Sequence, residues 1–236
     1  ATKEDIFVYE LSSHQLMNLK KSPQIAVFLN LYPEHLDYYR NIKEYLKAKQ
    51  NICRWQKRGD YFLFNPGDPS VRVSLKLTLA KKIPLDVKKA ESFLAKWGRS
   101  KLAGFYLLNI AAAIETGRLL GVKDSLIAKA IRSFKPLAHR LEFVGSFKGI
   151  KFYNDSLATI PEATLAAIES LGPEGETIFL GGFDRGLSFK GLAQKICQSR
   201  LKNLVFFPTT GSRIWREIKR QKEYNQSLRT FFVTGM

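Results

Sequence analysis

The sequence of 236 residues is poor in cysteine and contains no long apolar run. Its two cysteines, Cys53 and Cys197, are isolated, so neither a metal-ligand pair nor a disulfide framework is expected. No apolar stretch approaches the ~20 residues that a helix needs to span a membrane, and we expect no signal peptide. These absences predict a cytoplasmic protein with reduced thiols and no membrane span.

Acidic residues are also scarce, since 21 Asp and Glu stand against 38 Lys and Arg, a formal net charge of +17. A balance this basic raises nucleic acid or anionic lipid as partners. The basic residues are, however, spread along the chain, without an arginine-rich arm, a zinc module or an RNA-binding aromatic motif. We therefore expect a solvated basic surface that helps to attract polyphosphate substrates, and no nucleic-acid partner.

The hydrophobic pattern predicts an α/β protein, because short apolar runs alternate with segments of helical period. In the first half it predicts a basic, strand-rich segment at 71–93, strands at 6–9, 25–29 and 61–64, and helices at 36–56, 107–120 and 126–133. In the second half it predicts strands at 142–145, 151–153, 177–180, 203–207 and 230–233, and helices at 162–170, 189–198 and 212–221. We predict two domains, residues 1–136 and 137–236, of which the second is small and doubly wound.

The most informative stretch covers residues 152–164, Phe-Tyr-Asn-Asp-Ser-Leu-Ala-Thr-Ile-Pro-Glu-Ala-Thr. A strand that ends at Tyr153 is followed by a polar turn with Asp155 and Ser156, and Pro161 and Glu162 then open an alanine-rich helix. Such turns lie at the carboxyl edge of a parallel sheet, where α/β proteins bind their ligands. Taken alone, this turn is more simply interpreted as a helix cap, but other segments favour a ligand site.

Five segments in fixed order carry a resemblance to a known family. They are Glu10-Leu-Ser-Ser-His-Gln-Leu16, Glu34-His-Leu-Asp37 with Lys49 downstream, His139-Arg140, Asn154-Asp-Ser-Leu-Ala-Thr159 and Gly181-Gly-Phe-Asp-Arg185. Together they resemble the Mur ligases, most closely the members that add D-glutamate. The resemblance implies a partial central domain with a parallel sheet of the P-loop NTPase type, followed by a partial Rossmann-like C-terminal domain.

The sequence contains no G-x-x-x-x-G-K-[ST] phosphate loop. In a Mur ligase this loop lies upstream of the segment that Glu10 matches, after a domain that holds the uridine nucleotide. We therefore expect the chain to be part of a longer protein, cut at both ends, and we expect the isolated chain to lack ligase activity.

Three side chains are predicted to be catalytic and to hold Mg²⁺, namely Glu10, His35 and Lys49. A carboxylate at a strand end is a natural oxygen ligand for this hard ion, and the resemblance implies His35 as its partner. Lys49 falls on an apolar row of its predicted helix, where burial disfavours the charged amine. The resemblance implies a carbamylated Lys49 that donates anionic oxygens, and two Mg²⁺ ions; the plainer interpretation is a lysine that reaches the surface.

The resemblance also implies the contacts of the nucleotide. Asn109, Arg140 and Asp155 are predicted to bind ATP, and an always-charged guanidinium suits its phosphate oxygens. Phe105 and Tyr106 stand where the family has His and Asn, so this sequence departs from the family on the adenine side.

The substrate contacts are implied in the same way. Ser12, Thr159 and Arg185 are predicted to bind substrate, with Arg185 pairing with a glutamate carboxylate. Leu157 stands where many relatives carry Lys, which removes one cation from the predicted cleft.

The implied activity is ATP-dependent amide formation in peptidoglycan precursor synthesis, with UDP-N-acetylmuramoyl-L-alanine and D-glutamate as substrates and an acyl phosphate as intermediate. A monomer is expected. Two alternatives stay open: a sister ligase acting on a folate or another muramyl peptide, and a non-catalytic basic binding module on a degraded ligase scaffold. The absence of an Asp-Tyr-Ala-His turn disfavours the first, whereas Phe105, Tyr106 and Leu157 favour the second.

Overall fold

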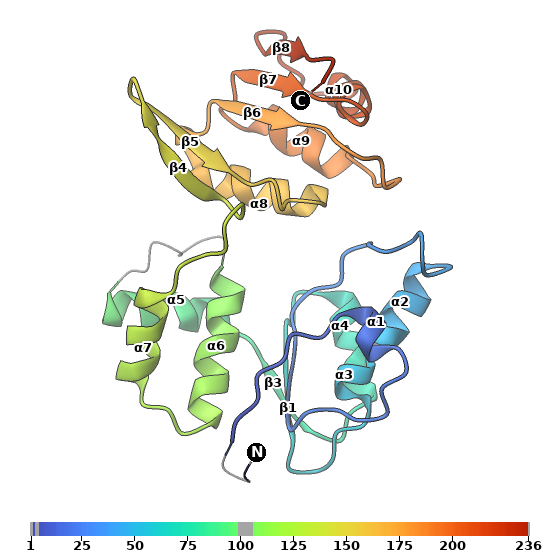
Figure 1. Ribbon diagram of the computed structural model, residues 1–236, viewed down its shortest axis with the longest axis vertical. Coiled ribbons are helices and arrows are strands. Elements are labelled where there is room, and N and C mark those ends of the chain that lie inside the picture. The colour runs from blue at the N-terminus through green and yellow to red at the C-terminus, as the bar shows by residue number, and fades with distance from the viewer. Residues whose placement is uncertain (1, 3–4, 99–105, 236) are drawn as a thin grey trace. The chain divides into compact units, whose positions relative to one another are not determined.

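The computed structural model describes residues 2, 5–98 and 106–235, which form a mixed α/β protein with parallel sheets (Figure 1). The chain divides into two compact units, residues 1–133 and 134–236. The predicted domain boundary lies between Pro136 and Leu137, shortly after this division. No helix in the described ranges combines the length and the apolar composition that a membrane span requires.

The first unit is built on a parallel sheet of three strands with β2 (Tyr61–Phe64) between β1 (Ile25–Phe28) and β3 (Lys81–Pro84). Successive side chains of a strand point to opposite faces, so Phe62 and Phe64 lie on one face of β2 and Leu63 on the other. All of these side chains are buried. The sheet is therefore covered on both faces, and its central strand is a continuous apolar run for that reason.

Helices from two parts of the first unit form the covering layers (Figure 1). Phe62 and Phe64 belong to a core with Tyr45 and Ala48, whereas Leu63 packs with the three helices that close the unit. The helical segments are α1 (Ser13–Leu16), α2 (Ile42–Lys49), α3 (Asn51–Arg54), α4 (Pro69–Arg72), the 3₁₀ turn η1 (Val73–Lys76), α5 (Val87–Trp97), α6 (Leu107–Leu119) and α7 (Asp124–Ser133).

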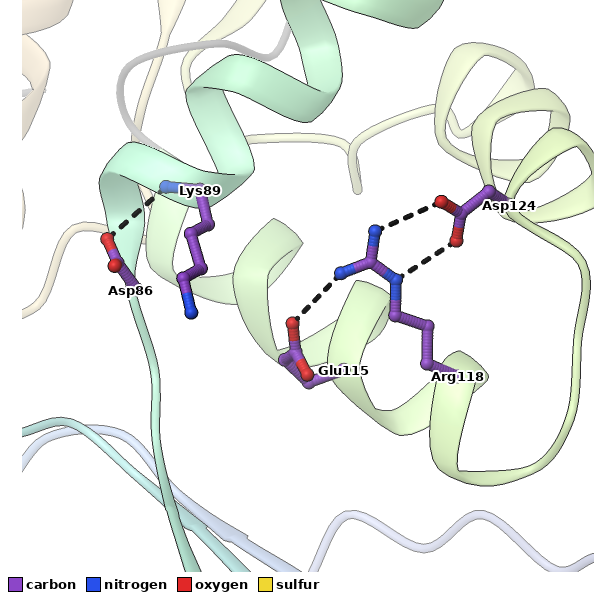
Figure 2. Close-up of polar contacts among 5 residues, drawn as sticks. All are labelled: Asp86, Lys89, Glu115, Arg118 and Asp124. Carbon is purple, nitrogen blue, oxygen red and sulfur yellow. Dashed lines mark hydrogen bonds and ion pairs between the residues drawn. The ribbon is translucent and has the colours of Figure 1, made fainter.

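An ion-pair cluster joins α6 and α7 (Figure 2). Arg118, near the end of α6, donates from Nε and Nη2 to the two carboxylate oxygens of Asp124 in α7, both at 3.0 Å, and from Nη1 to Glu115 at 3.2 Å. Its guanidinium also lies 5.5 Å from the ring centroid of Phe93 in α5. The cluster contains none of the predicted site residues, and we infer that it stabilises the packing of these helices.

The second unit begins with an antiparallel hairpin of β4 (Glu142–Phe147) and β5 (Ile150–Asn154). Lys148 and Gly149 form its two-residue turn with positive φ angles of 50° and 79°. Positive φ at both positions matches the right-handed twist of the two strands, so the turn fixes the register of the hairpin.

A second parallel sheet follows, in which β7 (Asn203–Phe206) lies between β6 (Thr177–Leu180) and β8 (Arg229–Phe232). The helical segments of this unit are α8 (Pro161–Leu171), the 3₁₀ turn η2 (Gly172–Glu174), α9 (Lys190–Gln198) and α10 (Gly211–Lys219).

The two faces of this second sheet differ. Leu204 and Phe206 of β7 point into a core formed with α8, α9 and α10. Phe179 and Phe231 lie in register with Val205 on the opposite face, and they are 62% and 50% exposed. Within the described residues, the helices therefore cover one face of the sheet and leave an apolar row open on the other.

Three of the predicted segments in the first unit are wrong. Residues 6–9 form no strand, because none of the described strands pairs with them, and their apolar side chains are exposed. The helix predicted at 36–56 begins only at Ile42, because Asn41 caps it by accepting from the N–H groups of Lys43 and Glu44, and it breaks at Gln50. The segment 71–93, predicted to be strand-rich, contains β3 but also η1 and most of α5.

Candidate functional site

The short helix α1 lies beside the candidate site, and Ser12 fixes its start. The Ser12 hydroxyl accepts from the N–H of Gln15 at 3.3 Å, and the Gln15 side chain accepts from the N–H of Ser12 at 2.8 Å. Asn51 then donates to two carbonyls at the end of α1 and anchors this helix to α3. Ser12, predicted to bind substrate, therefore acts in this structure as a helix cap, and Glu10 precedes it on an exposed segment.

The turn after β1 presents His35. The N–H of Leu31 donates to the carboxylate of Asp68 at 2.8 Å, which ties this turn to the one after β2. His35 has a left-handed φ of 56°, and its carbonyl accepts from the N–H groups of Tyr38 and Tyr39 at 3.1 and 2.9 Å. Non-glycine residues in this conformation are uncommon and concentrate at functional turns.

Lys49 is the last residue of α2 and is partly buried. Burial lowers the pKa of Lys49 below its ordinary value of 10.5, while the carboxylates of Glu34 and Glu10 oppose this shift. Both carboxylates therefore lie within electrostatic range of the amine. The lowered pKa favours the neutral amine, which is the form that can add carbon dioxide.

Tyr45 connects Lys49 to His35. The Nζ atom of Lys49 lies 5.3 Å from the Tyr45 ring centroid, and the His35 ring lies 6.0 Å from the same ring. Burial first, and then the charges of Glu34 and Tyr39, raise the pKa of Tyr45 to about 12, so its hydroxyl stays a hydrogen-bond donor at neutral pH. The hydroxyl of Tyr39 is buried and has no hydrogen-bond partner among the described residues.

His35 and Lys49 thus both lie near the Tyr45 ring, and Glu10 lies within electrostatic range of Lys49, although the three are far apart in the sequence. Tyr45 has no predicted role, yet the sequence contained a signal for it, because it lies four residues before Lys49 on the same helix face. His14, whose ring centroid lies 5.0 Å from that of His35, had no such signal, since its contact with His35 depends on how α1 packs.

The ion that the sequence predicts here, Mg²⁺, prefers carboxylate oxygens and keeps several waters. Glu10 and Glu34 offer carboxylates, and Tyr39 offers a buried hydroxyl without a partner. In the ranges that the structure describes, however, no three His, Cys, Asp or Glu side chains are placed to hold a metal ion. These side chains therefore fit Mg²⁺ only if Lys49 is carbamylated, because the carbamate supplies a further anionic oxygen.

In the second unit, Arg140 and Asp155 lie within electrostatic range of each other. Burial raises the pKa of Asp155, while a 2.8 Å hydrogen bond from the N–H of Leu141 and the charge of Arg140 oppose this shift. The His139 ring nitrogen lies 2.8 Å from the Asn154 side-chain amide, which closes the turn. His139 and Leu141 have left-handed φ angles of 63° and 47°, so Arg140 is exposed between two strained residues.

Arg185 lies in the turn after β6, next to an ion pair that fixes the turn. Asp184 pairs with Arg213 of α10, and Arg213 also donates to a carbonyl of the turn at 3.1 Å. Gly181 has a φ of 144°, and a Cβ atom at this position would lie 2.4 Å from the carbonyl oxygen of Phe207. Arg185 itself is exposed on this fixed turn.

The remaining predicted residues lie in separate places. Thr159 is exposed in the turn before α8, and Leu157 in the same turn is also exposed. Asn109 is exposed in the first turn of α6, in the other unit. Tyr106 packs against the core of α5, α6 and α7, and Phe105 lies outside the described residues.

An open recess of about 400 Å³ lies where β3 leads into α5. The Asp86 carboxylate at its edge already accepts from the N–H groups of Lys88 and Lys89, so it caps the helix. The recess has none of the predicted site residues in its walls, which are formed by Pro66, Pro84, Leu85, Asp86, Val87, Lys88 and Lys89.

Comparisons with known proteins identify relatives of this chain. Residues 1–112 match the Mur ligase middle domain. The chain is 32% identical over 227 residues to the UDP-N-acetylmuramoylalanine–D-glutamate ligase of Latilactobacillus sakei subsp. sakei, covering 89% of the chain and 50% of that protein. It is 33% identical over 234 residues to the ligase of the same name from Enterococcus hirae, covering 91% and 50%. The chain thus spans about half the length of these relatives.

Solved structures share the fold. MurF from Acinetobacter baumannii matches with a TM-score of 0.67 at 16% identity, covering 90% of this chain and 51% of that one. The MurF ligase from Thermotoga maritima in complex with ADP matches with a TM-score of 0.56 at 17% identity, covering 91% and 53%. At these identities the likeness concerns the fold alone, and it confirms the predicted α/β class.

Proposed function

Because this chain belongs to the Mur ligase family, we propose that it is about half of an ATP-dependent ligase that joins D-glutamate to UDP-N-acetylmuramoyl-L-alanine. Relatives that are 32% and 33% identical have names that state this reaction, which supports the proposal. The product would be a peptidoglycan precursor, made in the cytoplasm by a monomeric enzyme. Residues 1–136 would be part of its central domain and residues 137–236 part of its amino-acid-binding domain.

The proposed reaction has two steps. The terminal phosphoryl group of ATP passes to the carboxylate of the L-alanyl substrate, which gives an acyl phosphate and ADP. The amine of D-glutamate then attacks the acyl carbon, phosphate leaves, and the nitrogen loses a proton as the amide forms. Catalysis of such transfers depends mainly on positioning the reactants and on balancing charge.

Glu10, His35 and a carbamylated Lys49 would hold one of two Mg²⁺ ions. The lowered pKa of Lys49 supports this role, since only the neutral amine adds carbon dioxide. When bound, Mg²⁺ supplies positive charge that offsets the charge of the transferred phosphoryl group. Tyr45 lies against Lys49, with Nζ 5.3 Å from the ring centroid, and its pKa of about 12 keeps its hydroxyl protonated at neutral pH.

The second unit would contribute contacts to the nucleotide and to D-glutamate. Arg140 is an exposed guanidinium beside Asp155, a pair suited to phosphate and ribose oxygens. In the first unit, Asn109 is also proposed to contact the nucleotide. Arg185, on its fixed turn, would pair with a carboxylate of D-glutamate, and Ser12 and Thr159 would offer hydroxyls to the substrates.

The observation that carries the proposal is the placement of Lys49, which is partly buried, within range of Glu10 and Glu34, and one ring away from His35. A lysine that only extends into solvent would not be expected to be partly buried between two carboxylates and an aromatic ring. The same helix supplies a comparison in Lys47, which is exposed.

The test uses the full-length parent protein and its ATP-dependent ligation. Lys49→Ala should lower the rate at least about 100-fold, because charge stabilisation at the transferred group is lost, and formate or acetate should restore part of it by replacing the carbamate oxygens. Lys47→Ala should leave the rate unchanged. Undiminished turnover of Lys49→Ala would refute the carbamate assignment.

A further inference from the structure

His14 is the feature that the proposed function leaves unused. We propose that His14 is a positioning residue, which holds the ring of His35 by packing against it and against the tyrosines of the same turn. This role rests on the proposed function only in one respect, that His35 is a ligand of Mg²⁺.

The contacts of His14 form the basis of the inference. Its ring centroid lies 4.5 Å from that of Tyr38 and 5.0 Å from that of His35, both in edge-to-face geometry, and 5.6 Å from that of Tyr39. Edge-to-face pairs at these distances attract, because the positive edge of one ring meets the negative face of the other. A single side chain of α1 therefore touches three rings of the turn after β1.

His35 needs such support. Its left-handed φ of 56° is unfavourable for a residue with a Cβ atom, and the turn that contains it has no strand or helix of its own from 36 to 41. Two backbone hydrogen bonds to its carbonyl hold the main chain. The ring is flanked by Tyr45 of α2 at 6.0 Å and by His14 of α1 at 5.0 Å, so removing His14 leaves it with support from one element.

The geometry favours packing over metal binding as the role of His14. The rings of His14 and His35 meet at an angle of 81°, so an edge of one faces the plane of the other, as in packed aromatic pairs. If His14 acts by packing its ring, phenylalanine at this position should preserve the conformation of the turn, and alanine should not.

The experiment measures amide hydrogen exchange by NMR on the 236-residue chain. The N–H groups of Tyr38 and Tyr39 report the turn, because both donate to the carbonyl of His35. In His14→Ala they should exchange faster, by about 2- to 12-fold for each aromatic pair that the substitution removes, while the amides of β2 keep their wild-type rates. In His14→Phe the rates should return to within about 2-fold of wild type.

The matched control is His139→Ala, the same substitution in the other unit, which should leave Tyr38 and Tyr39 unchanged. Should His14→Ala fail to fold, Tyr38→Leu removes the shortest of the three ring contacts from an exposed position and should give the same local acceleration. Unchanged exchange in the folded variant, or equal acceleration in His14→Ala and His14→Phe, would overturn the inference.

A second measurement separates this inference from the proposed function. The chain has three histidines, His14, His35 and His139, so their ring resonances can be assigned individually. Magnesium chloride, titrated near pH 8, should shift the His35 resonance and leave His139 in place, and His14→Ala should need at least about 2-fold more Mg²⁺. No shift of His35 in the wild type would overturn the magnesium assignment, whereas the exchange rates alone decide whether His14 positions the turn.

Discussion

Replacing Gly181 by alanine tests how the turn that carries Arg185 is built. Gly181 combines a φ of 144° with a close approach to the next strand, where a Cβ atom would lie 2.4 Å from the carbonyl oxygen of Phe207. Gly182 has a similar φ of 125° but open space around its Cβ position. Gly175 has an ordinary φ of −79° and no contact shorter than 3.6 Å. The three glycines therefore separate backbone strain from steric overlap.

The expected costs follow from these differences. Gly175→Ala should change the free energy of unfolding by less than about 1 kcal/mol. Gly182→Ala should cost about 1–3 kcal/mol, because alanine is strained at its φ. Gly181→Ala should cost about 1–3 kcal/mol more than Gly182→Ala, because the backbone of Phe207 must also move to relieve the overlap.

The assay is urea unfolding followed by ¹⁹F NMR of chains labelled with 5-fluorotryptophan. The chain has three tryptophans, of which Trp215 packs against the core of the second unit while Trp55 and Trp97 report the first. The loss in Gly181→Ala should appear at Trp215. If Gly181→Ala and Gly182→Ala cost the same, the close approach to Phe207 is not what fixes this turn.

Three further predictions concern stability and reactivity. Burial raises the pKa of Cys53 from 9.0 to about 11, so the thiol ionises at lower pH in the unfolded state than in the folded state. The free energy of unfolding should therefore fall as the pH rises from 9 to about 11. In Cys53→Ala this fall should be smaller by about 2–3 kcal/mol. Iodoacetamide near pH 8 should accordingly modify Cys197 before Cys53, and equal rates by mass spectrometry would contradict the buried thiol. Arg118→Ala should lower the Tm by a few degrees at most, because the pairs with Asp124 and Glu115 are solvent-exposed. This loss should shrink in about 1 M salt, and a salt-independent loss would argue against an ionic interaction.

Much of the fold could be predicted from local pattern. The apolar run of β2 and the helical period of α6 are properties of consecutive residues, and both elements lie near their predicted bounds. The helix α5 was not predicted although Ala90, Phe93, Leu94 and Trp97 follow helical spacing after the cap Asp86, so the signal was present. Residues 6–9 illustrate the opposite case, because the pattern is strand-like but a strand also needs a neighbour that accepts its hydrogen bonds.

In the candidate site, too, features set by local sequence could be predicted, and features set by tertiary packing could not. The apolar row of α2 was enough to predict burial at Lys49, and Tyr45 could have been found from its spacing. The contact between His14 and His35 could not, because it depends on the packing of α1. The left-handed angles of His139 and Leu141 around Arg140 were equally hidden, since nothing in the local sequence signals such a conformation at either residue.

The ion pair between Asp184 and Arg213 has a consequence for protein engineering. The turn after β6 takes its shape from a residue of α10, nearly thirty positions later, which holds both its carboxylate and one of its carbonyls. Transplanting that turn by itself into a related ligase would leave its conformation behind. A transplant that keeps this conformation must carry the whole stretch from β6 to α10, because Arg213 is needed to hold the turn.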